Sequence, residues 1–161
     1  MSNVTWIPIV HSNNNSLQPM SWNYTIQIST QINPNNNYGQ IAKDFFEKYG
    51  IDSALSIANI ENYYTNESLI SLYMHEHGQN FLYEMVGHTN LKNKLSELGI
   101  WAIRYFNLMP TIQPVGKNSI MLSFYGHIEI SGKIYNVEST IIMKISGSTI
   151  KITNQILNIL L

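Results

Sequence analysis

The sequence predicts an α+β domain over residues 40–161, with a curved antiparallel sheet of six strands and helices packed on its concave face. Two observations carry this prediction. Apolar residues recur at helical spacing around residues 41–49 and 91–98, whereas the chain after Ile100 alternates apolar and polar residues as strands do. Helices and strands that come in blocks, instead of alternating one by one, are typical of an α+β fold.

Residues 1–39 differ from the rest of the chain in composition. They hold nine of the twenty Asn, three of the five Pro and no charged residue. Within them, Trp22, Tyr24, Ile26 and Ile28 alternate with polar residues, which predicts a strand. The segment is either a disordered Asn-rich tail or an ordered arm that adds a strand or docks on a partner. The apolar alternation favours an N-terminal arm.

The domain is predicted to begin with helices. Ile41, Phe45 and Tyr49 recur every four residues, which predicts an amphipathic helix that ends one residue after Tyr49. Asp52 can cap a second, short helix that carries the apolar residues of 55–60.

A hairpin and a further helix are expected next. Two strand-like runs, 68–75 and 81–86, are joined by a polar turn. Thr89 is then expected to be the N-cap of a helix that carries the leucines of 91–98 and ends at Gly99.

The remainder of the chain is predicted as strands. Four runs, 101–113, 119–130, 133–145 and 149–161, are separated by short turns that contain Gly or Pro, as in an antiparallel meander. If the last run is a regular strand, Ile150, Ile152, Ile156 and Leu160 share one of its faces.

Apolar residues occupy both faces of these last strands. A sheet covered only by its own helices should have a more polar outer face. We therefore expect a dimer packed sheet to sheet, either a homodimer or a heterodimer with a protein of the same fold. The residues assigned to the dimer face are Tyr135, Val137, Ile141, Ile152 and Leu157.

Composition excludes several classes of function. The 161 residues hold no Cys, which excludes disulfide frameworks, thiolate metal sites and cysteine nucleophiles. Nine Lys and Arg against ten Asp and Glu give a net charge of -1, so direct nucleic-acid binding is not expected. Twenty Asn and 24 Ile are the enrichment that an AT-rich genome, such as that of a protist or a large DNA virus, would produce.

No segment has the features of a signal peptide, and no run approaches the roughly 18 apolar residues of a membrane span. We therefore expect an intracellular protein of the cytoplasm, the nucleus or both, with no membrane association.

Five short strings resemble, in this order, the nuclear transport factor 2-like family over residues 40–161. They match an opening helix with an apolar pair and a tyrosine, an aromatic–tyrosine pair before the first strand, a Gly-containing turn into the second long helix, a Gln-Pro string and the final strand. The strings are Ala42–Tyr49, Ile60–Ser68, Val86–His88, Gln113–Val115 and Ile152–Leu157.

This resemblance implies a cone-shaped α+β barrel that is commonly a dimer through its sheet. Some members of the family carry or bind proteins, in nuclear transport, messenger-RNA export and stress granules. Others are cavity enzymes, the ketosteroid isomerases, dehydratases and polyketide cyclases, with carboxylates and His inside the cone. The fold alone does not choose between these groups.

A cavity enzyme needs a general base inside the cone. Glu84 and Glu138 lie in mid-strand and could point inward, whereas Glu129 lies next to a turn and is expected to be solvated. No fixed spacing links Glu84 or Glu138 to a His. We therefore expect no catalytic residue and no cofactor.

The string His-Glu-His at residues 75–77 is the one cluster typical of metal chemistry. Its two His would share a face of a strand and could bind a metal with His88 or His127. Because Gly78 follows directly, the string is expected at a hairpin tip, where a solvated polar turn is the simpler interpretation. We expect no metal site.

By resemblance to the protein-carrying members, a groove beside the first helix binds short Phe-containing peptides. Ile41 and Phe45 fall on the groove side of that helix, Tyr63 at the aromatic position before the first strand, and Ile150 at the start of the last strand. The alternative is that all four residues belong to the core, because apolar residues on a helix face usually do.

The leading hypothesis is a non-catalytic protein-interaction and dimerisation module, an adaptor in nucleocytoplasmic transport, export or assembly that docks Phe-containing peptides. The second is a cavity enzyme of the isomerase, dehydratase or cyclase type. The third is a structural component of a larger particle, such as a virus particle, with the uncharged arm wedged between neighbours.

Overall fold

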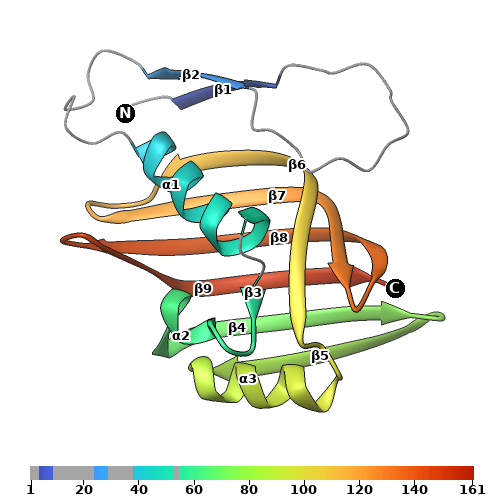
Figure 1. The fold of residues 1–161 in the computed structure, drawn as a ribbon. Coiled ribbons are helices and arrows are strands. Elements are labelled where there is room, and N and C mark those ends of the chain that lie inside the picture. Colours follow the sequence, from blue (N-terminus) through green and yellow to red (C-terminus); the bar gives the residue numbers. More distant parts are fainter. Residues whose placement is uncertain (1–3, 9–23, 29–37, 53–54) are drawn as a thin grey trace.

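The computed structural model describes residues 4–8, 24–28, 38–52 and 55–161 (Figure 1). In chain order the elements are β1 (Val4–Pro8), β2 (Tyr24–Ile28), α1 (Tyr38–Phe46), the π-helix η1 (Glu47–Asp52), β3 (Leu55–Ser56), α2 (Ile60–Tyr63), β4 (Tyr64–Glu76), β5 (Gln79–Val86), α3 (His88–Glu97), β6 (Ala102–Pro114), β7 (Ser119–Ile130), β8 (Lys133–Ser146) and β9 (Thr149–Leu160).

Strands β3 to β9 form one sheet, in the order β3-β6-β7-β8-β9-β4-β5. Neighbouring strands run antiparallel except β4 and β9, which run parallel. The predicted α+β cone is confirmed, but the sheet is mixed and has seven strands, so the prediction of six purely antiparallel strands is wrong. The parallel pair arises because the chain crosses from β5 through α3 to β6 and then fills the sheet back toward β4.

Two-residue turns set the register of the long hairpins. Ser131 and Gly132, between β7 and β8, have φ of 52° and 77°. Positive φ at both positions gives a type I′ turn, the mirror image of a type I turn, whose twist matches that of the flanking strands. His77 and Gly78 form the same kind of turn between β4 and β5, with φ of 48° and 78°. The hairpin tip predicted at this string is confirmed.

The sheet curls because β6 bends in its middle. Its pairing with β7 shifts between Phe106 and Met109, and Asn107 within the bulge has a φ of 52°. Gly126 of β7 accommodates the bend, because a Cβ there would lie 2.6 Å from the Asn107 carbonyl oxygen. Bulges of this kind increase strand twist and turn a sheet over its own concave side.

A second bulge lies in β9. The pairs Met143–Ile152 and Ile142–Asn154 with β8 leave Thr153 as an extra residue of β9. Ile152 before the bulge is buried on the concave side, and Gln155 after it is buried on the same side. The regular alternation predicted for this strand is therefore wrong beyond Ile152.

The first predicted helix is confirmed, since α1 continues as η1 past Tyr49. The second helix was misplaced: Leu55 and Ser56 form β3, which pairs with β6. The Ser56 amide donates to Asn59 Oδ1 at 2.8 Å, and this turn delays the helix until α2 begins. Asp52 closes η1 instead of capping a helix.

α3 begins earlier than predicted. Its N-cap is Gly87, not Thr89, and no side chain caps the helix. Gly87 has a φ of 83°, and a Cβ there would lie 2.5 Å from the Asn66 carbonyl oxygen. The close approach to β4 thus decides where the helix starts, and Leu91 and Leu95 bury its apolar side.

The predicted strand of the N-terminal arm is confirmed in part. β2 pairs antiparallel with β1 in a two-stranded sheet of its own, beside β6 in Figure 1. Trp22 and most of the arm lie outside the described residues. The proposed division of the chain at residue 39 falls within the first turn of α1.

The core lies between the concave side of the sheet and helices α1, α2 and α3. Its largest fully buried side chains are Tyr49, Tyr64, Tyr105, Phe46, Ile60, Leu72, Leu108, Ile112, Ile120, Leu122, Ile128 and Ile141. Within the part of the chain that the structure describes, no helix is long and apolar enough to cross a membrane.

Candidate functional site

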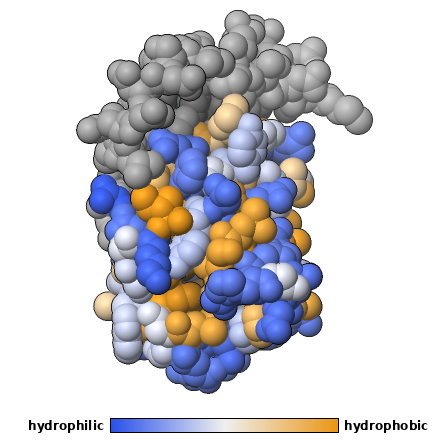
Figure 2. Space-filling model, turned by 90° about the vertical axis from the view of Figure 1, so that its right-hand side faces the viewer, coloured by the Kyte–Doolittle hydropathy of each residue, from blue (hydrophilic) through white to orange (hydrophobic). Residues whose placement is uncertain are grey.

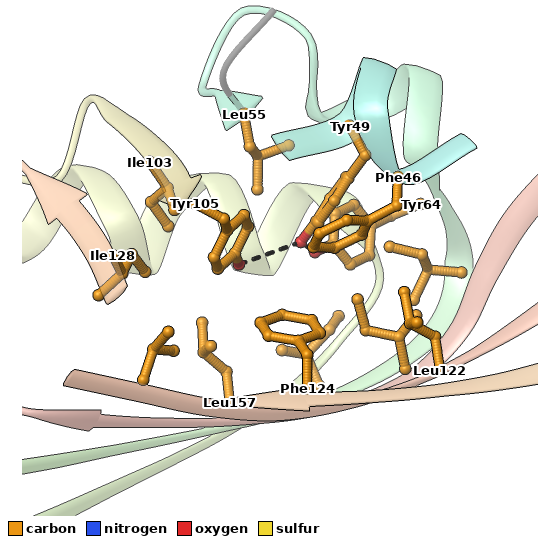
Figure 3. Close-up of a cluster of buried hydrophobic side chains, with 14 of the residues drawn as sticks. Phe46, Tyr49, Leu55, Tyr64, Ile103, Tyr105, Leu122, Phe124, Ile128 and Leu157 are labelled. Carbon is orange, nitrogen blue, oxygen red and sulfur yellow. Dashed lines mark hydrogen bonds between the residues drawn. The ribbon is translucent and has the colours of Figure 1, made fainter. Parts of the chain in front are cut away.

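Aromatic side chains fill the interior of the cone, between the concave face of the sheet and the helices (Figure 3). Phe46 of α1 packs against Tyr105 of β6 and Phe124 of β7, with ring centroids 5.6 and 4.9 Å apart. Tyr49 of η1 stacks on Tyr105 at 5.8 Å. Phe46 and Tyr49 reach the sheet together because they lie three residues apart on one helix face.

Five polar side chains form a hydrogen-bonded network within this apolar interior. The Tyr49 hydroxyl lies 2.7 Å from that of Tyr64 and 3.5 Å from that of Tyr105. Tyr64 donates to Gln155 Oε1 at 2.5 Å, and Gln155 Nε2 donates to Ser139 Oγ at 3.2 Å. Ser139 in turn donates to a backbone carbonyl of β9 at 2.9 Å. We call these five residues the tyrosine–glutamine network.

The network consists of neutral groups. Burial raises the pKa of the Tyr49, Tyr64 and Tyr105 hydroxyls well above the ordinary value, because a phenolate would lose its hydration there. The hydroxyls therefore remain protonated donors. Such donors can stabilise negative charge on a ligand oxygen, but proton transfer at carbon would also need a base.

The carboxylates that could supply a base point away from the interior. Glu138 lies between the buried residues Val137 and Ser139, so its exposed side chain is on the outer face of β8. Glu84 precedes the buried Met85 and is likewise exposed on the outer face. In the described residues, no carboxylate or imidazole hydrogen-bonds to the tyrosine–glutamine network. The prospect that Glu84 or Glu138 points inward is wrong.

The four histidines that the structure describes do not gather at one place. His75 Nδ1 lies 2.7 Å from Asn80 Oδ1, and the side chain of His77 is 91% exposed at the turn. His127 stacks on Phe106 at 5.8 Å on the outer face, and His88 begins α3. Across the described ranges, no three His, Asp or Glu side chains are grouped so that they could hold a metal ion.

The four residues of the predicted peptide groove lie in two environments. Phe45 is 8% exposed and belongs to the core, where its ring meets that of Tyr63 edge-on at 5.8 Å. Ile41, Tyr63 and Ile150 are half-buried against the core. The structure thus joins Phe45 to Tyr63, but Phe45 itself is too covered to be an exposed anchor.

The residues assigned to the dimer face from the sequence are wrong. Val137, Ile141, Ile152 and Leu157 are at most 6% exposed, and they face the helices on the concave side. Tyr135 is half-buried against the same core. The assignment failed because a strand with two apolar faces does not indicate which face its own helices cover.

The outer face of the sheet exposes a different set of apolar side chains. Leu69 and Ile156 are 52% and 49% exposed, and further exposed members are Leu82, Val86, Tyr125 and Leu160. Their neighbours across the strands are mostly uncharged, such as Ser71 beside Ile156 and Asn154 beside Leu69. Figure 2 views the end of the molecule near the C-terminus, where apolar residues form separate patches among polar ones.

Comparison with solved structures places this geometry among known folds. No protein-family model matches the sequence, and no curated protein matches it. Nuclear transport factor 2 from Cryptosporidium parvum is 16% identical, with a TM-score of 0.51 over 80% of this chain and 97% of that chain. A putative ketosteroid isomerase from Parabacteroides distasonis is 15% identical, with a TM-score of 0.50 over 81% and 92%.

The chain has the nuclear transport factor 2-like fold. A third similar structure is the complex of the yeast deubiquitinase Ubp3 with the cofactor Bre5, at 16% identity and a TM-score of 0.50 over 76% of this chain and 96% of that chain. The family resemblance seen in the sequence is thus confirmed at the level of fold. The nuclear transport factor 2-like fold serves binding proteins and isomerase-like proteins alike, so the choice rests on the residues of this chain.

Sequence reasoning missed the tyrosine–glutamine network. The regular alternation expected for the last strand places Gln155 on the face opposite Ile152, whereas the bulge at Thr153 brings both to the concave side. The signal in the sequence is the polar pair Thr153-Asn154, which interrupts the apolar run of the last strand. Within a nuclear transport factor 2-like cone, that interruption reverses which side chains face the interior.

Proposed function

We propose that the chain is a non-catalytic protein-interaction module that dimerises through the outer face of its sheet. The observation that carries the proposal is that this face exposes about half of each of Leu69, Val86 and Ile156, which lie on the adjacent strands β4, β5 and β9. Exposed apolar side chains gathered on one face are characteristic of surfaces that bind other proteins.

The interior of the cone supports a binding role over a catalytic one. Phe46, Tyr49 and Tyr105 occupy the space, and the tyrosine–glutamine network offers neutral donors. Glu84 and Glu138, the candidate bases, project from the opposite side of the sheet. A cavity enzyme would need another base, which the described hydrogen bonds of the network do not include.

As the finer proposal, the module acts as an adaptor in transport, export or assembly inside the cell, in the cytoplasm or the nucleus. A Phe-containing peptide docks on the half-buried side chains of Ile41, Tyr63 and Ile150, and Phe45 supports them from below. The likeness to nuclear transport factor 2 and to the Ubp3–Bre5 complex supports a partner that is a protein.

The test is the mass of the full chain in solution, measured by sedimentation equilibrium. We expect about twice the 18.4 kDa of one chain. Ile156→Glu should raise the dimer Kd about thirtyfold, because loss of a central interface residue costs about 2 kcal/mol. It should leave the thermal midpoint nearly unchanged, since the side chain is half exposed.

Trp101→Glu is the matched control. Trp101 is 64% exposed but precedes β6, away from the outer face of β8 and β9. The Trp101→Glu variant should therefore form the dimer with an unchanged Kd. A monomer at all concentrations, or equal loss of dimer in both variants, would contradict the proposed function.

A further inference from the structure

β5 is the last strand at one end of the seven-stranded sheet, and within the described part of the chain only β4 pairs with it. That pairing runs from Gln79 to Val86 without a bulge. Sheets usually protect such an edge with Lys, Pro or a bulge, because unpaired main-chain groups otherwise attract another strand. The β5 sequence, QNFLYEMV, contains neither Lys nor Pro. The free edge of β5 is therefore suited to pairing with a further strand.

The pairing pattern shows which main-chain groups of β5 face the free edge. Glu76 and Gln79 flank a two-residue turn, so they form a hydrogen-bonded pair, and such pairs alternate along the strand. At the far end, the Gly87 amide donates to the Ser68 carbonyl oxygen at 2.8 Å, which fits the same alternation. The N–H and C=O groups that point away from β4 are consequently those of Asn80, Leu82, Glu84 and Val86.

The helix α3 closes only one end of this edge. Asn90 Nδ2 donates to the Val86 carbonyl oxygen at 2.7 Å. In Figure 1, α3 lies beside the Val86 end of β5, whereas the part of β5 near the β4–β5 turn extends beyond the helix. No described residue donates to or accepts from the outward main-chain groups of Asn80, Leu82 and Glu84. These outward positions are thus available to a partner strand.

The available part of β5 is complementary to itself. If a second copy runs antiparallel about a two-fold axis at Leu82, Leu82 faces its own counterpart and Asn80 faces the partner's Glu84. Each of these pairs exchanges both main-chain hydrogen bonds. Asn80 Oδ1 lies 2.7 Å from His75 Nδ1, so the Asn80 Nδ2 is the group left to donate to the carboxylate of the partner's Glu84.

The opposite side of the strand also matches. Phe81 and Tyr83 point to the side that α3 covers, where Lys94 Nζ lies 5.0 Å from the centre of the Tyr83 ring. The same axis sets Phe81 across from the partner's Tyr83, and aromatic pairs of this kind stabilise antiparallel strands. Phe81 and Leu82 are 39% and 49% exposed, so the contact removes apolar surface from water on both sides of the sheet.

Other registers are less favourable. Moving the partner by two residues toward Val86 sets Leu82 against the partner's Glu84, and it needs the Val86 carbonyl, which Asn90 already occupies. A shift by four residues sets the two Glu84 carboxylates together, which is costly. A shift toward the turn leaves Glu84 opposite the turn residue Gly78. The register about Leu82 therefore pairs every available outward residue without a charge conflict.

We propose that two copies of this chain join their β5 strands antiparallel about Leu82, so that one sheet continues into the other. The contact is separate from the dimer proposed for the outer face, since it uses the main chain of an edge strand and leaves Leu69 and Ile156 uncovered. It involves few residues and therefore forms at higher protein concentration than the outer-face dimer. Chains that make both contacts assemble beyond the dimer.

Introduced cysteines test the register, because the chain has none of its own. In Leu82→Cys the two Cα atoms would lie about 5.5 Å apart, a distance that a disulfide spans. Mild oxidation should give a product of twice the 18.4 kDa of one chain in a gel without reductant. Asn80→Cys is the matched control, since its two copies would lie about 13 Å apart and should cross-link about tenfold more slowly or not at all.

Leu82→Pro tests the main-chain contact. The Leu82 N–H faces the free edge, so Pro removes the central donor of the contact without breaking a hydrogen bond to β4. It is added to the double variant Asn80→Cys/Glu84→Cys, whose cysteines face each other across the contact, and should slow cross-linking about tenfold. Leu82→Val keeps the N–H and should leave the rate unchanged. Circular dichroism checks that both variants are folded.

The outcomes separate this contact from the proposed function. Cross-linking of Leu82→Cys no faster than that of Asn80→Cys, at up to about 1 mM chain, overturns the edge contact and leaves the outer-face dimer standing. Equal rates with Leu82→Pro and Leu82→Val overturn main-chain pairing, and an edge that pairs only with a segment of a different protein overturns pairing with a second copy. Cross-linking of Leu82→Cys that persists when Ile156→Glu is added supports the edge contact independently of the outer face.

Discussion

Tyr64 and Gln155 are joined by a hydrogen bond of 2.5 Å between the tyrosine hydroxyl and the amide Oε1, across the parallel strands β4 and β9. Both side chains are at most 3% exposed. A buried polar group without a partner is costly, so this bond helps to specify how the β4–β5 hairpin docks on the rest of the sheet.

Tyr64→Phe should lower the free energy of unfolding by about 1–2 kcal/mol, because Gln155 Oε1 loses its short hydrogen bond. In this variant, Gln155 Oε1 still accepts the longer hydrogen bond of 3.4 Å from the Tyr49 hydroxyl. Urea unfolding followed by circular dichroism measures the change. Tyr125→Phe is the control, since the exposed Tyr125 hydroxyl donates a hydrogen bond to the Met109 sulfur and has no part in the tyrosine–glutamine network. Equal losses of unfolding free energy in Tyr64→Phe and Tyr125→Phe would show that the buried hydroxyl contributes no more to stability than the exposed one.

Stability should depend on pH in the alkaline range. Burial raises the folded-state pKa of Tyr49, Tyr64 and Tyr105 above the ordinary 10.0. Their contribution is therefore complete below about pH 10, where the unfolded chain is still protonated, and is lost as pH rises through the folded-state pKa. The free energy of unfolding, measured with urea between about pH 8 and pH 11, should fall as the pH rises. In Tyr64→Phe it should fall less steeply. Tyrosinate absorbance that develops fully at about pH 10 in the folded protein would contradict this.

Phe45→Ala should cost about 3–5 kcal/mol of unfolding free energy, as expected for a buried Phe. Its ring contacts Tyr49 at 5.9 Å and Tyr63 at 5.8 Å, and the cavity would lie under both. Thermal unfolding measures the loss. A loss below about 1 kcal/mol would mean that the side chain is not part of the core.

Peptide docking is better tested at Ile41, which is half-buried on α1. Ile41→Ala should weaken binding of a synthetic Phe-containing peptide about tenfold, because an apolar contact is removed from the groove, and should cost only about 1 kcal/mol of stability. Calorimetric titration measures the affinity. Ile57→Ala is the matched control, since Ile57 is also half-buried against the core but follows β3. Equal weakening in both variants would place the peptide elsewhere.

Much of the fold could be predicted because turns delimit the strands. The runs predicted at 119–130 and 133–145 agree with β7 and β8 to within one residue, since Ser131 and Gly132 mark the turn between them. The helical spacing of Ile41, Phe45 and Tyr49 likewise located α1 and η1. Local patterns of this kind depend on a few neighbouring residues, which the sequence displays directly.

The candidate site was less predictable because it depends on which face of the sheet is covered. Alternation in β8 separates Val137 from Glu138 but does not indicate which of them lies on the concave side that the helices cover. The bulge at Thr153 then exchanges the faces of β9, which brings Gln155 inside and leaves Ile156 outside. Which face of β8 is covered and where β9 bulges both depend on segments that are distant in sequence, so no local sequence pattern predicts them.

The position of β9 between β8 and β4 bears on how the chain folds during synthesis. β4 and β5 are made early, but the strand that joins them to the meander is made after every other strand of the sheet. Contacts so distant in sequence are slow to form and leave intermediates exposed. A nascent chain stopped before β9 should hold two separate half-sheets, each open to proteolysis along its unpaired edge, and protection should appear only when β9 leaves the ribosome.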